Sequence, residues 1–280
     1  MLRDKLRARL DAMGDAPDHQ RLVAEVLGIR GAPPELARRL VAQALVVEDR
    51  QEVWRQTGVR LRKDAPASPG VYILRDEEGR ALYVGKALNL RRRLSTHFSG
   101  RRWRAMQPAL SRVVDVEWRE VGSELEALLR EAELIHDLRP IVNVQTGPPD
   151  FKTRDVPGAL VRDVLVIVPS IEEDSAELVG ARPDGGWMIQ RTRRSGADLV
   201  VHTQRLLRFF VGRLSARKAR PEGASRLAPI VFSWLAGRGS EATRLDPHDA
   251  ASARALRGRL LALLHDRSLF LERLDQRTLL

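Results

Sequence analysis

The sequence predicts an α+β protein in which a central unit of strands and helices lies between a mostly helical N-terminal region and a mixed α/β C-terminal region. Apolar residues recur at helical spacing through much of residues 1–60. Short apolar segments typical of strands then flank turn residues at 76–80. Clusters of proline and glycine at residues 65–70 and 147–149 separate these patterns. The expected regions are residues 1–64, 65–147 and 148–280.

The composition is that of a soluble, globular protein rather than a fibrous or membrane-spanning one. Hydrophobic residues make up 43% of the 280 residues and charged residues 30%. No apolar run approaches the roughly 18 residues that a membrane span needs. Cysteine is absent, which excludes disulfides, thiolate-bound clusters and a cysteine nucleophile. These features fit a cytoplasmic location.

The charge balance favours a polyanionic partner. Lys and Arg total 48 against 37 Asp and Glu, a formal net charge of +11. Only five of the 48 are lysine, so the basic residues are mostly arginine, which binds phosphate through a planar fork. A GC-rich genome accounts for most of the preference for arginine over lysine, but not for the excess of bases over acids. The composition therefore indicates a nucleic-acid partner.

The N-terminal region is expected to be mostly helical. Leucines recur at helical spacing near its start, and residues 35–45 form an amphipathic pattern that begins after two prolines. Two short segments then flank Thr57-Gly58 and predict a hairpin over residues 52–62. Helices followed by a small basic hairpin suit a winged helix-turn-helix. A helical cap on the next unit explains the same pattern about equally well.

The central region alternates between strands and helices. Its last helix is strongly indicated, because Ser123 and Glu126 have the spacing of a capping box and Arg139-Pro140 ends the pattern. The expected strands are 71–75, 81–84 and 113–121, and the expected helices are 88–98 and 123–138.

The C-terminal region is expected to mix strands and helices. One strand is expected at residues 163–168, and two further strands should pair around a turn at 184–185. Helical patterns follow at residues 198–214 and 250–265. No motif in this region indicates what it does.

The only two tyrosines of the chain lie in the two strands of one expected hairpin. Tyr72 and Tyr83 share a face of the sheet only if the pairing register allows it. The helix that follows places Arg93 and His97 four residues apart on the flank of its apolar stripe. This pair can extend into the space beside the tyrosines. A solvated basic face is the alternative, but it explains His97 poorly.

One carboxylate of the helix expected over 123–138 lies on its apolar side. Glu131 falls in the middle of the apolar arc, whereas Glu126, Glu133 and Asp137 share a polar arc with Arg130. A buried carboxylate without a partner is costly, so Glu131 requires one. The two usual partners are a basic side chain and a metal ion, and structural ion pairs are the commoner of the two.

Five motif blocks occur in order between residues 66 and 147. The blocks are Pro69–Tyr72, Leu82–Ala87, Asn89–Arg93, Glu126–Ile135 and Arg139–Asn143. Together they resemble the GIY-YIG endonuclease domain, most closely in the branch that contains the excision-repair protein UvrC and its shorter relative Cho. His97 stands where that branch usually has tyrosine, and the flanks of the chain show no visible resemblance.

The resemblance implies a GIY-YIG nuclease fold, a three-stranded antiparallel sheet flanked by helices. It also implies that Tyr72 and Tyr83 face the scissile phosphate and that Glu131 is the single protein ligand of one divalent cation, Mg²⁺ or Mn²⁺. The other implied site residues are Lys86 and Arg93 beside the phosphate, His97, and Asn143, which would close the site from a strand-like tail.

Three of these residues are candidates for activating the attacking water. Tyr72 is the first choice and Tyr83 the second. A free tyrosine is only about 0.1% ionised at neutral pH, so nearby cations must favour the phenolate. His97 is the third candidate, either as base or as a donor to phosphate.

A basic segment, residues 91–104, begins in the helix expected over 88–98 and continues past its end. This segment is expected to follow the DNA backbone. It contains no acidic residue and includes a tryptophan, a combination that suits backbone contacts and base stacking. A solvated loop is the alternative. The expected DNA-binding residues are Arg91, Arg92, Arg101, Arg102, Trp103 and Arg104.

The sequence thus predicts a metal-dependent DNA endonuclease of nucleotide-excision-type repair, with DNA and damage-recognition or other repair proteins as partners. A restriction, mobile-element or branched-DNA nuclease with the same domain is one alternative. A non-catalytic DNA-binding protein on a nuclease scaffold is another, although such a protein is expected to have lost Glu131, Arg93 or a tyrosine. The preferred lesion, the side of incision, the oligomeric state and the role of residues 148–280 are left open.

Overall fold

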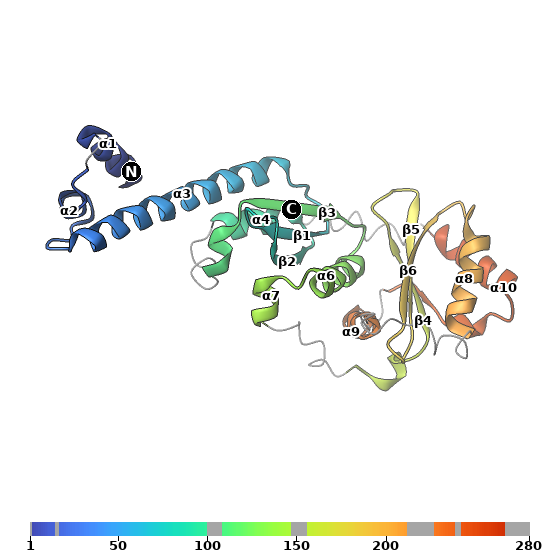
Figure 1. Cartoon of the computed structure of the whole chain (residues 1–280). Coiled ribbons are helices and arrows are strands. Elements are labelled where there is room, and N and C mark those ends of the chain that lie inside the picture. The colour runs from blue at the N-terminus through green and yellow to red at the C-terminus, as the bar shows by residue number, and fades with distance from the viewer. Residues whose placement is uncertain are drawn as a thin grey trace.

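The computed structural model describes residues 2–14, 17–99, 108–146, 156–211, 227–238 and 242–266. In this part of the chain, a helical N-terminal arm, a central three-stranded sheet and a four-stranded sheet follow one another along the molecule (Figure 1). None of the helices in the described ranges is long and apolar enough to cross a membrane.

Three helices form the N-terminal arm. The first two pack against the beginning of the third, with Leu6, Leu22 and Val41 buried between them. A short π-helical turn follows the second helix and ends at Gly28, whose φ of 72° is a left-handed value that favours glycine. The helices are α1 (Leu2–Met13), α2 (His19–Leu22) and α3 (Pro34–Asp64).

The prediction of a hairpin over residues 52–62 is wrong, because α3 runs through this segment as one helix of 31 residues. Gly58 is not a turn residue. A Cβ atom at Gly58 would lie 2.9 Å from the Cβ of Phe98, so the glycine lets α3 approach a neighbouring helix closely. A glycine inside a helix costs about 1 kcal/mol relative to alanine. The arm is therefore helical and lacks the wing of a winged helix.

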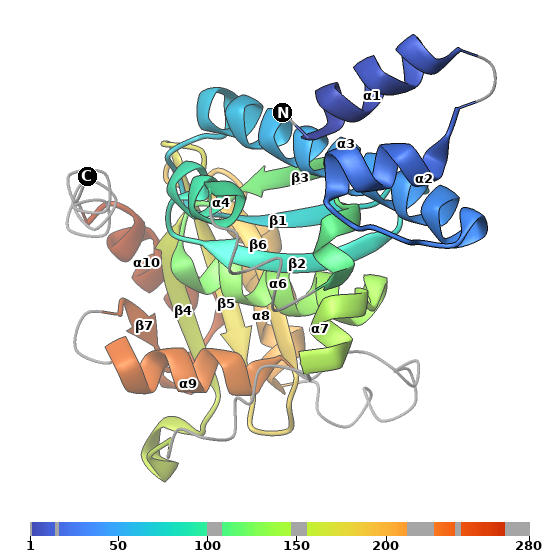
Figure 2. The same ribbon diagram turned by 90° about the vertical axis from the view of Figure 1, so that its left-hand side faces the viewer.

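The central sheet is antiparallel with the strand order β2-β1-β3, so β2 forms one edge (Figure 2). This confirms the expected three-stranded sheet with flanking helices. Ser123 caps α6 as expected, because its hydroxyl accepts a hydrogen bond from the Glu126 backbone N–H, while the Glu126 carboxylate accepts one from the Gly122 N–H rather than from Ser123. The elements are β1 (Gly70–Arg75), β2 (Ala81–Ala87), α4 (Leu90–Ser99), β3 (Asp115–Glu120), α6 (Glu124–Leu138) and α7 (Ile141–Thr146).

The turn between β1 and β2 is organised by Asp76. Its carboxylate accepts hydrogen bonds from the backbone N–H groups of Glu78 and Arg80 and pairs with Arg112 at 2.6 Å. Burial acts to raise the pKa of Asp76, but the hydrogen bonds from Arg80 and Arg112 hold it well below its usual range. This turn fixes the hairpin and therefore which side chains of the two strands share a face.

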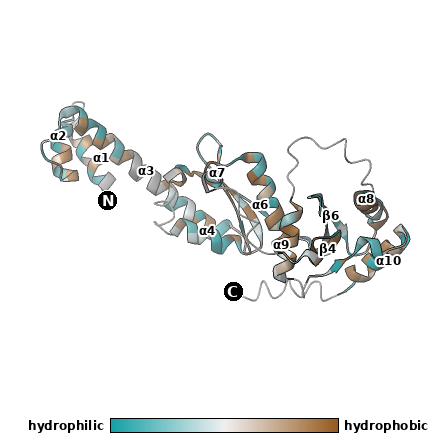
Figure 3. Ribbon diagram, turned by 90° about the horizontal axis from the view of Figure 1, so that it is seen from below, coloured by the Kyte–Doolittle hydropathy of each residue, from teal (hydrophilic) through white to brown (hydrophobic). Residues whose placement is uncertain are grey.

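The C-terminal region is a second antiparallel sheet, with the strand order β6-β5-β4-β7. The pairing of β5 with β6 confirms the hairpin expected around residues 184–185. α8 and α10 cover one face and α9 packs on the other, and Figure 3 shows hydrophobic residues along β4 and α8. The elements are β4 (Val164–Pro169), β5 (Ser175–Ala181), β6 (Trp187–Arg193), α8 (Leu199–Val211), α9 (Ala228–Arg238), β7 (Arg244–Leu245) and α10 (Ala253–Leu264).

Helix α6 belongs to the cores of both sheets (Figure 1). Ala127 packs with Val71 against the central sheet, whereas Leu125 and Leu129 are fully buried in the core of the C-terminal sheet. At the start of α6, a Cβ atom at Gly122 would overlap the backbone at the end of β4. The hydrophobic cores therefore connect the central and C-terminal regions through this helix.

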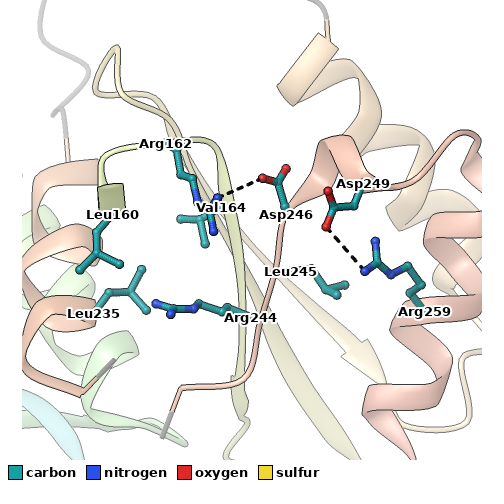
Figure 4. A pocket seen from close by; sticks show the side chains of 9 residues that line it. All are labelled: Leu160, Arg162, Val164, Leu235, Arg244, Leu245, Asp246, Asp249 and Arg259. Atoms are coloured by element: carbon teal, nitrogen blue, oxygen red, sulfur yellow. Dashed lines mark ion pairs between the residues drawn. The ribbon is translucent and has the colours of Figure 1, made fainter. Parts of the chain in front are cut away.

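The C-terminal region contains a pocket of about 220 Å³ between β4, β7, α9 and α10 (Figure 4). Three arginines and two aspartates line it. Arg162 pairs with Asp246 and Arg259 pairs with Asp249, each at 3.7 Å. Two of the three positive charges are thus compensated within the pocket, and none of the residues expected in the active site lines it.

Candidate active site

The two tyrosines lie on the same face of the central sheet. In the β1–β2 pairing, Tyr72 is opposite Gly85 and Leu74 is opposite Tyr83, so both rings project to one side. Their ring centroids are 6.0 Å apart. Tyr72 is fully buried, whereas Tyr83 remains partly exposed. The sequence left open whether the two tyrosines share a face of the sheet, and the register of the hairpin places them on the same face.

Gly85 makes room for this pair. A Cβ atom at Gly85 would lie 2.5 Å from the hydroxyl oxygen of Tyr72 and 2.7 Å from Cε1 of Tyr83. Contacts this short do not occur between real side chains, so any larger residue would displace one of the two rings. The sequence contains Gly85 within a motif block, but its packing role is visible only in the structure.

His97 on α4 is hydrogen-bonded to Tyr72, with 2.7 Å between Nε2 and the hydroxyl oxygen. Burial and the nearby charge of Arg93 lower the His97 pKa to about 4. His97 is therefore neutral at pH 7, and the tautomer of its ring decides whether Nε2 accepts the proton of this bond or donates it. Burial raises the pKa of Tyr72 well above its usual value. Both groups are uncharged in the resting site.

Arg93 provides the positive charge next to this pair. Burial and Glu131 raise the pKa of Tyr83, while the Arg93 guanidinium opposes them. The same guanidinium opposes the effect of burial on Tyr72. Because α4 places Arg93 one turn before His97, the two side chains approach the tyrosines from the same helix. This agrees with the spacing expected from the sequence.

Glu131 of α6 faces β2, where one oxygen of its carboxylate accepts a hydrogen bond of 2.9 Å from the Lys86 backbone N–H. Burial raises the Glu131 pKa, and the charges of Lys86 and Arg93 counteract that rise. No lysine or arginine in the described ranges forms an ion pair with it. The ion-pair alternative weighed from the sequence is therefore not the arrangement found among these residues.

The surroundings of Glu131 fit a divalent cation. A partly buried carboxylate with a raised pKa gains from a nearby positive charge, and oxygen is the ligand atom that Mg²⁺ and Mn²⁺ prefer. Within the described part of the chain, no group of three or more His, Cys, Asp or Glu side chains has metal-binding geometry. A cation at Glu131 would therefore take most of its ligands from water and substrate, as Mg²⁺ commonly does.

Lys86 lies at the same end of β2. Its ammonium group is 3.9 Å from a carboxylate oxygen of Glu124, and its side chain is 32% exposed. Its backbone N–H is the group that holds Glu131. The residue thus contributes to the site through its main chain as well as its charge.

The family resemblance implied that Asn143 lies in a strand-like tail. The structure instead places it in helix α7. Its side-chain amide forms two hydrogen bonds with the backbone of Val84: the Val84 N–H donates to Oδ1 at 2.8 Å and Nδ2 donates to the Val84 carbonyl at 3.0 Å. Val84 lies between Tyr83 and Gly85 on the edge strand. Asn143 therefore secures the strand that carries the tyrosine, which the sequence did not indicate.

The expected DNA-binding residues are only partly described. The Arg91 guanidinium donates a hydrogen bond of 2.7 Å to the Ala65 carbonyl, so this side chain is engaged in holding α4. Arg92 is exposed on the same helix, and its backbone N–H is capped by Asn89. The remaining expected residues, Arg101, Arg102, Trp103 and Arg104, lie outside the described residues.

Residues 68–144 match the family model of the UvrC-like GIY-YIG domain. This segment is a UvrC-like GIY-YIG domain. It includes both tyrosines, Arg93, His97 and Glu131, together with the edge-strand clamp at Asn143. The fold and the endonuclease class expected from the motif blocks are thereby confirmed for this part of the chain.

Two curated relatives extend the comparison. The UvrABC system protein C of Desulforudis audaxviator strain MP104C is 44% identical over 82 residues, which cover 29% of this chain and 13% of that protein. The UvrABC system protein C of Syntrophus aciditrophicus strain SB is 47% identical over 198 residues, covering 64% of this chain and 32% of that protein. The motif blocks showed a resemblance only within residues 66–147. Similarity to the second relative extends beyond these residues. The chain spans only a minor part of either relative.

Solved structures of the GIY-YIG N-terminal endonuclease domain of UvrC from Thermotoga maritima are also similar. The structure bound to magnesium, described as the catalytic divalent cation of that domain, is 31% identical and has a TM-score of 0.28. The match covers 31% of this chain and 94% of that one. A point mutant of the same domain, also bound to its catalytic divalent cation, is 30% identical.

Proposed function

We propose that this chain is a metal-dependent DNA endonuclease that hydrolyses phosphodiester bonds in nucleotide-excision-type repair. One observation carries the proposal: the Tyr72–His97 hydrogen-bonded pair, the Arg93 cation and the partly buried Glu131 carboxylate meet in one place. A scaffold that only binds DNA has no need to keep these groups together. Their position inside a UvrC-like domain supports the assignment to repair.

Glu131 is the residue that would hold the divalent cation. When bound, Mg²⁺ or Mn²⁺ supplies Lewis-acid stabilisation of the charge that develops on the phosphate and on the leaving oxygen. The Lys86 N–H fixes one Glu131 oxygen and leaves the other to face the cation. Loss of the Glu131 charge should therefore abolish metal-dependent cleavage without removing any DNA contact.

The Tyr72–His97 pair is the proposed proton acceptor. A lone Tyr72 phenolate is disfavoured because burial raises the Tyr72 pKa. With His97 neutral, the Tyr72 hydroxyl can take a proton from the attacking water while it passes its own proton to Nε2 of His97. The charge of the resulting imidazolium is offset by the negative phosphate. Because Tyr72 is fully buried in the structure, this step requires bound DNA to bring the attacking water to its hydroxyl, after which His97 carries the proton.

Arg93 and Lys86 are the proposed phosphate contacts. Arg93 lies beside both tyrosines, where its guanidinium would neutralise charge on the phosphorus centre in the transition state. Lys86 would approach the phosphate from β2, the strand that also carries Tyr83. Arg92, which is exposed on α4, and the four expected residues at 101–104 would contact the DNA backbone on either side of the scissile bond.

This function gives the protein DNA and other repair proteins as partners. The relatives are each named as component C of a UvrABC system, and a name of that kind denotes a protein that acts with others. We also propose a cytoplasmic location, because the expected substrate is cellular DNA. A damage-recognition protein would supply the selection of the lesion.

Cleavage assays on three DNAs test the proposal: a lesion-containing duplex, an undamaged plasmid and a branched junction. Each is incubated with Mg²⁺, Mn²⁺ or a chelator, with and without damage-recognition proteins. Metal-dependent incision near the lesion is the expected result. Preference for the plasmid or the junction would favour the restriction or branched-DNA alternative. DNA binding without cleavage under every metal condition would favour a non-catalytic protein.

A further inference from the structure

Helix α3 precedes the segment that matches the domain family, yet its second half packs on α4, the helix that carries Arg93 and His97 (Figure 1). Trp54 is the main contact and is only 3% exposed. Its ring stacks on Phe98 with 4.2 Å between centroids. Its indole Nε1–H also donates a hydrogen bond of 3.2 Å to the Phe98 carbonyl. Phe98 is therefore held through both its ring and its main chain.

Gly58 lies one helical turn after Trp54 and makes the second contact with Phe98. The space for a Cβ atom at this position is already filled, because it would lie 2.9 Å from the Phe98 Cβ. Farther along α3, Leu61 is fully buried in the same core as Tyr72. The contact between the two helices is thus continuous with the core beneath the tyrosines.

The beginning of α4 is held by the segment that follows α3. The Arg91 N–H donates to the Pro66 carbonyl at 2.9 Å, and the Arg91 guanidinium donates to the Ala65 carbonyl at 2.7 Å. Residues at and after the end of α3 therefore secure the first turn of α4, while Trp54 secures its last turn. His97 lies in that last turn, directly before Phe98.

We propose that Trp54 is a positioning residue of the nuclease, which acts through Phe98 to set helix α4 so that His97 meets Tyr72. The proposal rests on the proposed function and assigns part of the N-terminal arm to the catalytic unit. The 2.7 Å bond between His97 and Tyr72 depends on the rotation and the height of the last turn of α4. A shift of about 1 Å in such a group can cost on the order of a hundredfold in rate.

Single-turnover cleavage at saturating DNA and Mg²⁺ tests the proposal in the full chain. Trp54→Ala should slow cleavage by about ten- to a hundredfold, while the DNA dissociation constant stays within about twofold because no proposed DNA contact is removed. Trp54→Phe keeps the ring stack and should recover most of the rate. Val59→Ala is the matched control, because this valine is 50% exposed on the same helix.

Gly58→Ala separates positioning from stability. Alanine favours a helix more than glycine does, so an effect on α3 alone would leave cleavage unchanged or improve it. If the Phe98 contact sets α4, the added methyl group should push Phe98 away and slow cleavage. Slowed cleavage that persists well below the melting temperature supports the proposal. If Trp54→Ala and Gly58→Ala both cleave at the wild-type rate at lower temperature, the proposal is overturned.

A measurement without DNA distinguishes a failure of this inference from a failure of the proposed function. The His97 imidazole, identified by the NMR signal missing in His97→Gln, should titrate near pH 4 in the wild-type chain. Tyr72, Tyr83 and Arg93 surround it, so loosening α4 should move its pKa toward the ordinary value near 6.5. An unchanged titration in Trp54→Ala overturns the inference even if the enzyme cleaves. A wild-type chain that never cleaves rejects the proposed function but leaves this test intact.

Discussion

The hydrogen bond between Tyr72 and His97 changes which residue is expected to carry the proton. The sequence indicated both tyrosines and His97, because their types and spacing fit a nuclease motif. It could not indicate that Tyr72 would be fully buried or that its hydroxyl oxygen would lie 2.7 Å from Nε2 of a neutral imidazole. Those facts depend on the packing of α4 on the sheet. They favour a proton relay over a free phenolate.

The pH dependence of cleavage separates these two mechanisms. The relay needs neutral His97, whose pKa of about 4 keeps it in this form throughout the neutral range. We therefore expect the rate at saturating metal to be nearly flat between about pH 6 and 8. A phenolate base would give a rate that rises about tenfold per pH unit over the same range, since burial holds the Tyr72 pKa above its usual value.

The Tyr72→Phe and His97→Ala variants test the same relay. Removing either member should slow cleavage by a similar factor, on the order of 10²–10⁴-fold, because each breaks the same proton path. The double variant should be little slower than either single one. Full activity of Tyr72→Phe together with inactive His97→Ala would instead make histidine the direct base.

Gly85→Ala tests the packing of the tyrosines. The added methyl group would meet the Tyr72 hydroxyl at 2.5 Å, so the ring must shift away from His97. Cleavage should fall by roughly a hundredfold while DNA binding persists. Leu88→Ala, at a position 48% exposed just after β2, is the control and should cleave normally. A fully active Gly85→Ala variant would show that the site tolerates displacement of the tyrosine.

At the level of secondary structure, local signals predicted most elements, and the errors came from long-range contacts. The capping box marked the start of α6, and alternation with turn residues marked both hairpins. Thr57-Gly58 looked like a turn because the reason for its glycine, the contact with Phe98, lies forty residues away in the sequence. The family resemblance implied a strand-like tail at Asn143, but this segment forms α7 against β2.

Asn143→Ala should destabilise the edge of the central sheet. It leaves the N–H and C=O groups of Val84 without their partners, at a cost of about 1–3 kcal/mol. Thermal unfolding and single-turnover cleavage measure the two effects, and both should decline because Val84 lies between Tyr83 and Gly85. Asn143→Asp keeps the acceptor but loses the donor, so its stability should be intermediate. Wild-type stability of Asn143→Ala would mean that water replaces the clamp.

Across the whole molecule, the two helices that carry the candidate site residues are supported from outside the domain that the family model matches. α4 rests on α3, and α6, which carries Glu131, buries Leu125 and Leu129 in the core of the C-terminal sheet. The motif blocks predicted the domain itself, since they contain the residues of the candidate active site. They contained no sign of these supports, because buried leucines on a helix do not reveal which surface covers them.

Leu129→Ala tests whether the C-terminal sheet supports α6. The cavity should cost about 2–5 kcal/mol of unfolding free energy and should also slow cleavage, because α6 holds Glu131. Leu206→Ala, a fully buried leucine in the core on the far face of the same sheet, is the matched control. It should cost similar stability but leave cleavage unchanged while the protein is folded. Equal effects of the two variants on cleavage would argue against a specific role of α6.

Glu131 is proposed to hold a divalent cation for DNA cleavage, and the Glu131→Gln variant tests this role. Glutamine keeps the shape and an oxygen for the Lys86 N–H but loses the charge. Cleavage in Mg²⁺ should fall at least about a hundredfold, since a bound metal contributes several kcal/mol and each ~1.4 kcal/mol is tenfold in rate. DNA affinity, measured at the same salt, should be unchanged. Cleavage by Glu131→Gln at close to the wild-type rate would show that Glu131 does not hold the cation needed for cleavage.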